Sequence, residues 1–270
     1  VKNVGLLAIS SFDLNYQVDS GSIITESVNG LDLQTSDSYN YTYTEEWAAT
    51  SGTYTLNVWV SNINGGGDDD DTSNDMLSKS VSVASASTQN LPLFESFTSS
   101  TCGPCAPFNQ NVFNPFMDAH PNDIAVIKYQ MSWPGNGDPY YTAEGGVRRI
   151  YYGVSFVPDL YTGGFQTATN AGGVNAAYNY ETARPAFFNM TADYTVNGDI
   201  IDVNVDITPY ITVDMRVHIA VIELETTGNV GGNGETSFEH VMMKMLPDAD
   251  GTVVSFVADT PTSINESFDM

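Results

Sequence analysis

The sequence predicts an α/β domain placed between two antiparallel β-sandwiches. Three observations support this fold class: polar and apolar residues alternate up to about position 89, two nearly continuous apolar runs follow, and alternation returns from about position 183. Alternation is typical of strands with one buried face, whereas continuous apolar runs are typical of strands buried on both faces. The expected domains are therefore 1–89, 90–182 and 183–270.

The first domain contains short alternating sets separated by Gly, Ser, Asn and Asp, a pattern that predicts an antiparallel β-sandwich. The apolar and aromatic members of these sets are Leu14, Tyr16 and Val18; Tyr39, Tyr41 and Tyr43; Tyr54, Leu56, Val58 and Val60; and Val81 and Val83. The segment SGTYTLNVWV resembles the corner and following strand of immunoglobulin-like domains, with Tyr54 in the corner position. We therefore expect an immunoglobulin-like sandwich here.

The middle domain has a different pattern. The runs LPLFESF and DIAVIKYQ indicate two buried parallel strands, and three segments between and after them favour helices: Ala106–His120, Thr142–Tyr152 and Asn170–Thr182. Strands that alternate with helices in this way predict a parallel sheet. In the last domain, IIDVNVDITPY, VHIAVIELE and TVVSFVAD predict strands of a second sandwich. Because no final turn is evident, we expect the end of the chain to truncate this sandwich.

The charge balance is strongly acidic. Eight Lys and Arg stand against 33 Asp and Glu, which gives a net charge of −25. Such a surface repels phosphates and anionic lipid headgroups, so nucleic acid and anionic membranes are not expected partners. The sequence contains no run of 18 apolar residues, so it predicts no transmembrane helix. The chain begins at Val1 without a signal-peptide pattern, and we expect it to be a mature or excised part of an exported protein.

The only two cysteines of the chain form the motif Cys102-Gly-Pro-Cys105. The motif follows a buried-type strand and precedes a helical segment, a setting that indicates redox chemistry. A zinc site would need two further ligands, and His120, His218 and His240 are isolated in the sequence, so no metal is expected.

The two cysteines are expected to have different roles. A helix N-terminus next to Cys102 would favour its thiolate. We therefore expect Cys102 to be the attacking thiol, more exposed than Cys105 and at the start of the helix, and Cys105 to be the resolving thiol behind it.

Two segments carry a resemblance to a known family. FTSSTCGPC resembles the active-site segment of thioredoxins, and YYGVSFVPDLYTGG resembles their loop before the penultimate strand, in which an X–Pro bond is cis. The resemblance implies a thioredoxin-like domain, a cis Val157–Pro158 bond that faces the cysteines, and a Val157 backbone that pairs with the substrate chain. The longer string DPYYTAEGGVRRIYYGVSFVPDLYTGG resembles a family of bacterial outer-membrane-associated proteins with a thioredoxin-like core and β-rich flanks.

The chain also departs from the thioredoxin pattern. Thr101 stands where thioredoxins carry Trp, and Ser96 stands where they carry a buried carboxylate, with Glu95 one position earlier. On a strand, an offset of one residue reverses the side-chain direction unless a bulge corrects it. Lys128 matches the lysine that accompanies that carboxylate in the family. Glu95 and Lys128 are therefore expected to form either a proton relay to Cys105 or an ordinary ion pair near a strand end.

The sequence thus predicts a thiol–disulfide oxidoreductase that acts on protein substrates in the cell envelope or outside the cell. It would need no cofactor, but a separate redox partner would have to recycle the cysteines. Trp133 would either line the substrate groove or pack against a neighbouring β-domain. The alternative function is a secreted binding or structural module that keeps the CGPC motif as a stable disulfide.

The string GGGDDDDTSND places five aspartates in a glycine-rich loop between residues 65 and 75. Carboxylates bind Ca²⁺, and a third hypothesis is calcium-dependent surface assembly through this loop. The string does not have EF-hand spacing. We therefore expect Asp68–Asp71 to form a solvated hairpin loop that binds no metal.

Overall fold

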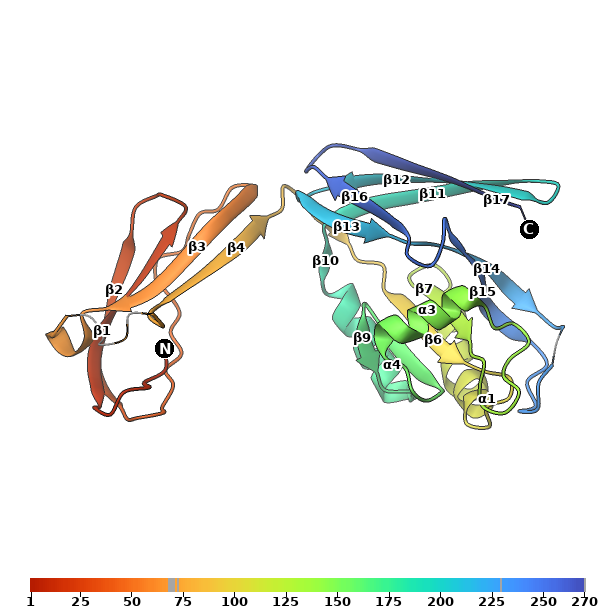
Figure 1. Ribbon diagram of the computed structural model, residues 1–270, viewed down its shortest axis with the longest axis horizontal. Helices are drawn as coiled ribbons and strands as arrows, with labels where there is room; N and C mark the ends of the chain where they lie inside the picture. Colours follow the sequence, from red (N-terminus) through yellow and green to blue (C-terminus); the bar gives the residue numbers. More distant parts are fainter. Residues whose placement is uncertain (68–70, 72, 229, 270) are drawn as a thin grey trace. The chain divides into compact units, whose positions relative to one another are not determined.

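The computed structural model describes residues 1–67, 71, 73–228 and 230–269. The chain divides into two compact units, Val1–Ser85 and Ala86–Met270, where the sequence predicted three domains. Strands make up 45% of the chain and helices 15%. The secondary structure of both units is shown in Figure 1.

The first unit contains a four-stranded antiparallel sheet with the strand order β2-β1-β3-β4. The strands are β1 (Ile9–Val18), β2 (Ile24–Leu33), β3 (Gly52–Ser61) and β4 (Met76–Val83), and a short 3-10 helix, η1 (Ile63–Gly65), follows β3. Phe12, Leu14 and Val28 form the buried centre of this unit. The alternating sets at 14–18, 54–60 and 81–83 therefore lie in strands, as their spacing predicts.

The tyrosine set at 39–43 was also expected to be a strand, and this prediction is wrong. Tyr39, Tyr41 and Tyr43 lie outside the strands and pack against the buried centre of the sheet. The ring centroids of Phe12 and Tyr39 are 6.2 Å apart, and those of Tyr16 and Tyr43 are 4.8 Å apart. An extended segment places alternate rings on one side whether or not its backbone pairs with a neighbour. A single sheet covered by tyrosines thus replaces the predicted immunoglobulin-like sandwich.

The second unit is built on a six-stranded sheet with the order β14-β15-β7-β6-β8-β9. Its strands are β6 (Leu93–Thr98), β7 (Ala125–Gln130), β8 (Asp159–Thr162), β9 (Phe165–Thr167), β14 (Ile219–Thr226) and β15 (Phe238–Leu246). Strand β7 is parallel to both of its neighbours, β6 and β15, and the other pairings are antiparallel. Figure 1 shows β14 and β15, in blue, beside β7.

The remaining strands form three smaller sheets. They are β11 (Phe188–Asn197), β12 (Ile200–Pro209) and β17 (Thr262–Asp269) in one sheet, β13 (Val213–Val217) and β16 (Thr252–Phe256) in another, and β5 (Thr88–Gln89) paired with β10 (Pro185–Ala186). Val205, Ile207 and Ile264 from the three-stranded sheet share a buried core with Phe256 from β16. The two larger of these sheets therefore stabilise each other through one apolar cluster.

Helices begin within one residue of the predicted segments 106–120, 142–152 and 170–182. They are α1 (Cys105–Phe108), the π-helical turn η2 (Asn109–Phe113), α2 (Asn114–Ala119), α3 (Ala143–Tyr152) and α4 (Ala171–Thr182). Thr142 Oγ1 caps α3 by accepting from Gly145 N at 3.1 Å, and Asn170 Oδ1 caps α4 by accepting from Gly173 N at 3.0 Å. Among the described residues, no helix is long and apolar enough to cross a membrane.

The two faces of the six-stranded sheet carry different cores. One core holds Phe94 and Val126 together with the aromatic residues of α1, η2 and α2. The other holds Phe97 and Tyr129 together with residues of β15 and of the segment that follows α3. Successive residues of a strand point to opposite faces, so residues 94, 96 and 98 of β6 face one core and residues 95 and 97 face the other.

These observations correct the predicted fold class. The chain is not a predominantly α/β thioredoxin-like domain between two β-sandwiches, because strands outweigh helices three to one and form several sheets. Residues 183–270 do not make a separate sandwich, since β14 and β15 belong to the same sheet as β6 and β7. Most of β15 is buried or half-buried, so its sequence FEHVMMKML lacks the alternation expected of a sandwich strand.

A buried ion pair lies within the second core. The Arg148 Nη2 atom donates to Glu95 Oε1 at 2.7 Å, and Tyr129 OH donates to the same oxygen at 2.9 Å. Tyr152 OH donates to Glu95 Oε2. Burial and the neighbouring carboxylate raise the pKa values of both tyrosines, so both hydroxyls remain protonated donors at neutral pH. Glu95 is therefore satisfied by three partners.

We predict that Arg148→Met lowers the free energy of unfolding of the second unit by about 3–5 kcal/mol, because it leaves the Glu95 carboxylate buried without its cation. Arg149→Met is the matched control on the same helix, since no ion pair with a described residue holds Arg149, and it should cost about 1 kcal/mol. Urea unfolding of both variants measures the two values. Equal losses would show that the buried pair contributes no more than a surface side chain.

Candidate functional site

The CGPC motif lies where β6 passes into the first helix. Cys102 N donates to Ser99 O at 3.0 Å and closes a turn, and Cys105 begins α1. The two cysteines form a disulfide with an S–S distance of 2.10 Å and a Cα–Cα distance of 5.3 Å. Cys102 was expected to begin the helix, but the helix begins at Cys105. The reason is that a residue that precedes proline, here Gly103, is disfavoured in helical conformation.

Both cysteines are buried. Cys102 is 1% exposed and Cys105 is 0% exposed, so both are enclosed and Cys102 is only marginally the more exposed of the two. The backbone N–H of Cys105 points at the Cys102 Sγ atom, with an N–Sγ distance of 3.2 Å. This N–H would stabilise negative charge on Cys102 once the disulfide opens.

A loop from a distant part of the chain also reaches the disulfide. The Val157–Pro158 bond is cis, as expected, and the Val157 carbonyl oxygen lies 3.5 Å from Cys102 Sγ. Val154 and Val157 of this loop pack into the second core, and Arg149 Nε donates to Val154 O at 3.0 Å. The segment that precedes Pro158 is therefore held firmly against Cys102.

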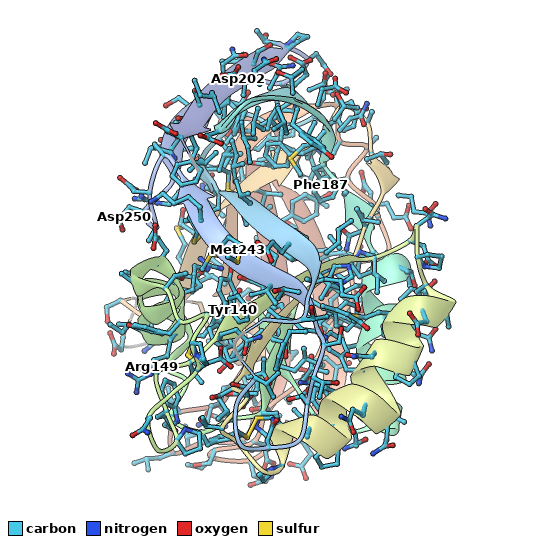
Figure 2. All side chains as sticks on the ribbon, turned by 90° about the vertical axis from the view of Figure 1, so that its right-hand side faces the viewer. Tyr140, Arg149, Phe187, Asp202, Met243 and Asp250 are labelled. Carbon is cyan, nitrogen blue, oxygen red and sulfur yellow. A yellow bond between two sulfur atoms is a disulfide. The ribbon has the colours of Figure 1, made fainter. Side chains whose placement is uncertain are left out.

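The segment that contains Trp133 forms a second wall of the CGPC loop. The Thr101 hydroxyl donates to Pro134 O at 2.7 Å, and Asp138 Oδ2 accepts from Ser100 N at 2.6 Å. The half-buried Trp133 packs at the edge of the second core, and the guanidinium of Arg149 lies 4.6 Å from its ring centroid. Trp133 thus borders the site through its neighbour Pro134, while its ring packs on α3. Figure 2 labels Arg149, which belongs to α3.

The structure does not bring Glu95 and Lys128 together. Lys128 pairs with Ser96 across β6 and β7, and both face the core that contains α1 and α2. Glu95 pairs with Ile127 and faces the opposite core, where Arg148 binds it. No bulge corrects the offset of one residue, so a direct relay from Glu95 through Lys128 to Cys105 has no path.

Lys128 is a buried cation with a single hydrogen-bond partner among the described side chains. Its Nζ atom donates to Asn114 Oδ1 at 2.7 Å and lies 5.4 Å from the Phe113 ring centroid. Burial lowers the pKa of Lys128 to about 8, although the charges of Glu239 and Glu235 act in the opposite direction. A fraction of this lysine is therefore neutral at mildly alkaline pH.

A third segment, which the sequence patterns did not indicate, touches the CGPC loop. Asn233 N donates to Ser100 O at 2.9 Å, and Asn233 Nδ2 lies 3.2 Å from both Ser99 O and Cys102 O. This segment connects β14 to β15, and Asn233 lies 131 positions after Cys102. In the sequence it is the string GGNGET, which indicates only a turn.

The same segment carries a buried carboxylate to the CGPC side of the sheet. Glu235 is 4% exposed and accepts from Asn109 Nδ2 at 2.8 Å and from Asn233 Nδ2 at 2.5 Å. Asn109 lies one helical turn after Cys105 and also donates to Thr98 Oγ1 at 3.2 Å. A carboxylate that Ser96 cannot supply therefore reaches this face from another part of the chain.

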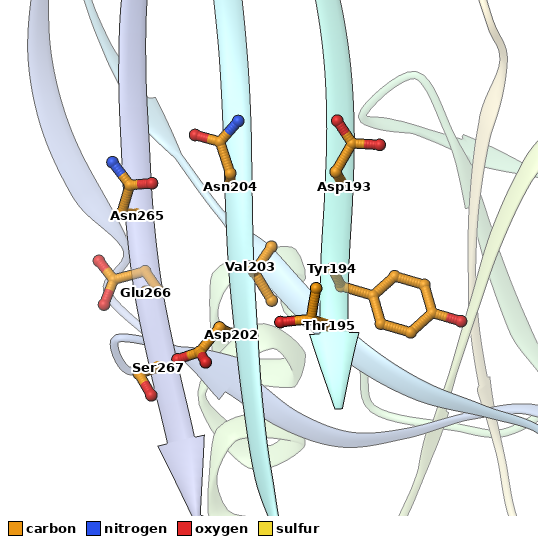
Figure 3. A pocket seen from close by; sticks show the side chains of 9 residues that line it. All are labelled: Asp193, Tyr194, Thr195, Asp202, Val203, Asn204, Asn265, Glu266 and Ser267. Atoms are coloured by element: carbon orange, nitrogen blue, oxygen red, sulfur yellow. The ribbon is translucent and has the colours of Figure 1, made fainter. Parts of the chain in front are cut away.

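Other parts of the surface offer less chemistry. A shallow hollow on the three-stranded sheet is lined by Asp193, Tyr194, Thr195, Asp202, Val203, Asn204, Asn265, Glu266 and Ser267 (Figure 3). The described residues contain no group of three or more His, Cys, Asp or Glu side chains that could hold a metal ion. The predictions for Asp68–Asp70 lie outside the described residues, and Asp71 is exposed and accepts from Ser73 N.

Three features therefore meet at the CGPC turn. They are the Cys102–Cys105 disulfide, a backbone donor aimed at the Cys102 sulfur, and a carbonyl beside that sulfur. The three segments that surround the turn come from 131–138, 153–158 and 231–235.

Comparison with known proteins gives one weak structural match. No protein-family model matches the chain, and no curated protein sequence is similar to it. A solved structure, protein AGR_C_4864 from Agrobacterium tumefaciens, has a TM-score of 0.49 and 18% sequence identity. The match covers 67% of this chain and 80% of that protein, and its description states no activity.

We predict that the stability of the second unit rises between pH 8 and pH 10 because of Lys128. The folded-state pKa of about 8 lies below the ordinary value of 10.5. Within this window the folded protein has released the Lys128 proton while the unfolded chain still holds it, so folding becomes more favourable as the pH rises. The full effect is about 3 kcal/mol.

The variant Lys128→Met removes this titration. The difference between its free energy of unfolding and that of wild type should therefore favour the variant most at pH 7 and should decline towards pH 10. Arg216→Met, an exposed substitution in the same unit, is the control, because arginine does not titrate in this range. Urea unfolding at several pH values measures both differences. A constant difference for Lys128→Met would contradict the lowered pKa.

Proposed function

We propose that the protein is a thiol–disulfide oxidoreductase that acts on protein substrates in the cell envelope or outside the cell. The observation that carries this proposal is the contact between the Cys102 sulfur and the Val157 carbonyl, which precedes a cis proline. A carbonyl in this position can accept a hydrogen bond from the backbone of a substrate chain while its sulfur reacts with Cys102. The sequences of both segments resemble those of thioredoxins, which supports the same reaction class.

The oxidised state that the structure contains would act on a protein dithiol. One substrate thiolate attacks Cys102 Sγ, the Cys102–Cys105 bond breaks, and Cys105 leaves as a thiolate. The second substrate thiolate then attacks the substrate sulfur of the mixed disulfide and releases Cys102 as a thiolate. The substrate loses two electrons and becomes a disulfide, while Cys102 and Cys105 gain two electrons and take up the two protons as thiols.

The reverse reaction uses the same atoms. The Cys102 thiolate attacks a substrate disulfide, and Cys105 then attacks Cys102 Sγ and releases the reduced substrate. A separate protein dithiol or disulfide must restore the starting state. The N–H of Cys105, directed at Cys102 Sγ, favours Cys102 as the sulfur that carries the negative charge.

The surrounding residues support this division of roles. Pro158 and Val157 would position the substrate backbone, and the Trp133 segment would limit the site on the other side. Glu95 stabilises the opposite core and does not act on the cysteines. Lys128 faces the same core as α1. Because its pKa is lowered to about 8, Lys128 would lose its positive charge on this face as the pH rises above that value.

One observation favours the alternative function. Both cysteines are almost completely buried, which is also the expected state of a structural disulfide in a secreted binding module. In that case the disulfide would stabilise the turn between β6 and α1 and would not exchange with other proteins.

A trapping experiment decides between the two functions. We predict that Cys105→Ser, which retains Cys102, forms a stable mixed disulfide with a disulfide-bonded peptide and is alkylated quickly near neutral pH. Cys102→Ser, which retains only the enclosed Cys105, is the matched control and should do neither. Mass spectrometry of the intact protein measures both reactions. Slow and equal reaction of both variants would leave the structural module as the function.

Wild-type protein should also accelerate the reduction of insulin by dithiothreitol, because the cysteine pair passes electrons from the reagent to the insulin disulfides. The acceleration should be lost in both single-cysteine variants. An unchanged rate with wild-type protein would count against exchange with protein substrates.

A further inference from the structure

The segment Gly231–Glu235, here called the strap, crosses the CGPC loop. Asn233 holds it through its backbone N–H, which donates to Ser100 O, and through its side-chain amide, which reaches Ser99 O and Cys102 O. Glu235 N donates to Asn233 Oδ1 at 3.0 Å, so the asparagine also fixes the path of the strap itself. One side chain therefore connects the strap to the residues on both sides of the CGPC turn.

The strap also fits closely against the loop at Gly231. A Cβ atom on this residue would lie 2.3 Å from Ser100 Oγ and 2.4 Å from Ser100 O, distances that no folded protein tolerates. The strap can therefore approach the backbone of Ser100 only because residue 231 is a glycine. At Gly232, in contrast, an added Cβ would meet nothing within 4 Å.

Exchange requires this arrangement to open. An incoming thiolate must reach the Cys102 sulfur from the side opposite Cys105, yet Cys102 is only 1% exposed. Two elements from elsewhere in the chain lie within hydrogen-bond distance of Cys102: the strap, at the Cys102 carbonyl oxygen, and the loop that carries Val157, at the sulfur. One of them has to move before the reaction can begin.

Fewer buried apolar contacts hold the strap than hold the loop that carries Val157. Gly232 and Gly234 are exposed, and Glu235 is the only buried residue of the segment, so most of its attachment comes from hydrogen bonds. The other loop buries Val154 and Val157 in an aromatic core, and lifting it would expose apolar surface to water. Glycine-rich, hydrogen-bonded segments open locally more readily than packed ones.

We propose that the strap holds the CGPC turn in its closed form and that Asn233 determines access to Cys102. With the strap in place, the turn keeps Cys102 at 1% exposure. When the hydrogen bonds of Asn233 break, the turn is released and Cys102 Sγ becomes the site of attack. This proposal rests on the proposed function only in that the exposed pair then exchanges with protein substrates.

The strap also carries Glu235, so its movement changes the electrostatics of the site. Closed, the strap places a carboxylate beside Asn109 on the cysteine side of the sheet. Open, it takes this negative charge away from the face on which an attacking thiolate must form new contacts. Access and charge are therefore coupled in one movement, which would favour reaction only in the open form.

The rate at which dithiothreitol reduces the Cys102–Cys105 disulfide tests the proposal. The reaction is stopped with an alkylating reagent, and mass spectrometry counts the alkyl groups. Gly231→Ala should force the strap away from Ser100, and Asn233→Ala should remove its side-chain attachments. We expect each variant to be reduced at least tenfold faster than wild type. Gly232→Ala, the matched control in the same segment, should react at the wild-type rate.

Hydrogen exchange separates strap opening from general unfolding. Backbone amides of β6 and β7 should exchange as slowly in Gly231→Ala and Asn233→Ala as in wild type. Equal reduction rates in all four proteins would overturn the proposal, and so would faster reduction accompanied by equally faster exchange of these core amides. Asn233→Asp, which keeps the side-chain size without the donors, replaces Asn233→Ala if that variant does not fold.

Failure of the strap proposal can be distinguished from failure of the proposed function. If the strap variants are reduced faster but Cys105→Ser traps no peptide, the strap controls access to a disulfide that does not serve protein substrates. If Cys105→Ser traps the peptide but the strap variants behave as wild type, the oxidoreductase function holds and the strap proposal fails.

Discussion

The side-chain alternation of β6 governs the arrangement of the second unit. Because this strand is paired on both sides by β7 and β8, each of its residues has a fixed face. Glu95 points into the aromatic core beneath α3, while Ser96 points toward the helix that follows the cysteines. One residue of register thus separates a buried ion pair, which stabilises the fold, from the face on which sulfur chemistry would take place.

The CGPC turn has little structure of its own, and its shape comes from what docks on it. The Trp133 segment, the Val157 loop and the strap each reach this turn through backbone atoms or short polar side chains. Hydrogen bonds of this kind specify position closely but contribute only about 1 kcal/mol each. A site held in this way can be accurately placed and still open at modest cost, which a site enclosed by large apolar side chains could not do.

Local patterns in the sequence were enough to predict the helix starts near Thr142 and Asn170 and the parallel pair β6 and β7, and the resemblance to thioredoxins implied the cis bond before Pro158. These features depend on neighbouring residues or on a short motif. The sheet to which β14 and β15 belong could not be predicted, because a strand pattern does not state which partner it pairs with. Asn233 and Glu235 were missed for the same reason, since a glycine-rich turn becomes part of a site only through contacts with residues more than 100 positions away.

The burial of both cysteines limits the rate at which the pair can exchange with thiols in solution. A solvent-exposed pair equilibrates with ambient thiols within its chemical reaction time, and so it reports the current redox potential. A pair enclosed to 1% and 0% exposure exchanges only as often as its enclosure opens. If the pair exchanges as proposed, its oxidation state follows a change in ambient thiols with a delay that is set by the rate of this opening.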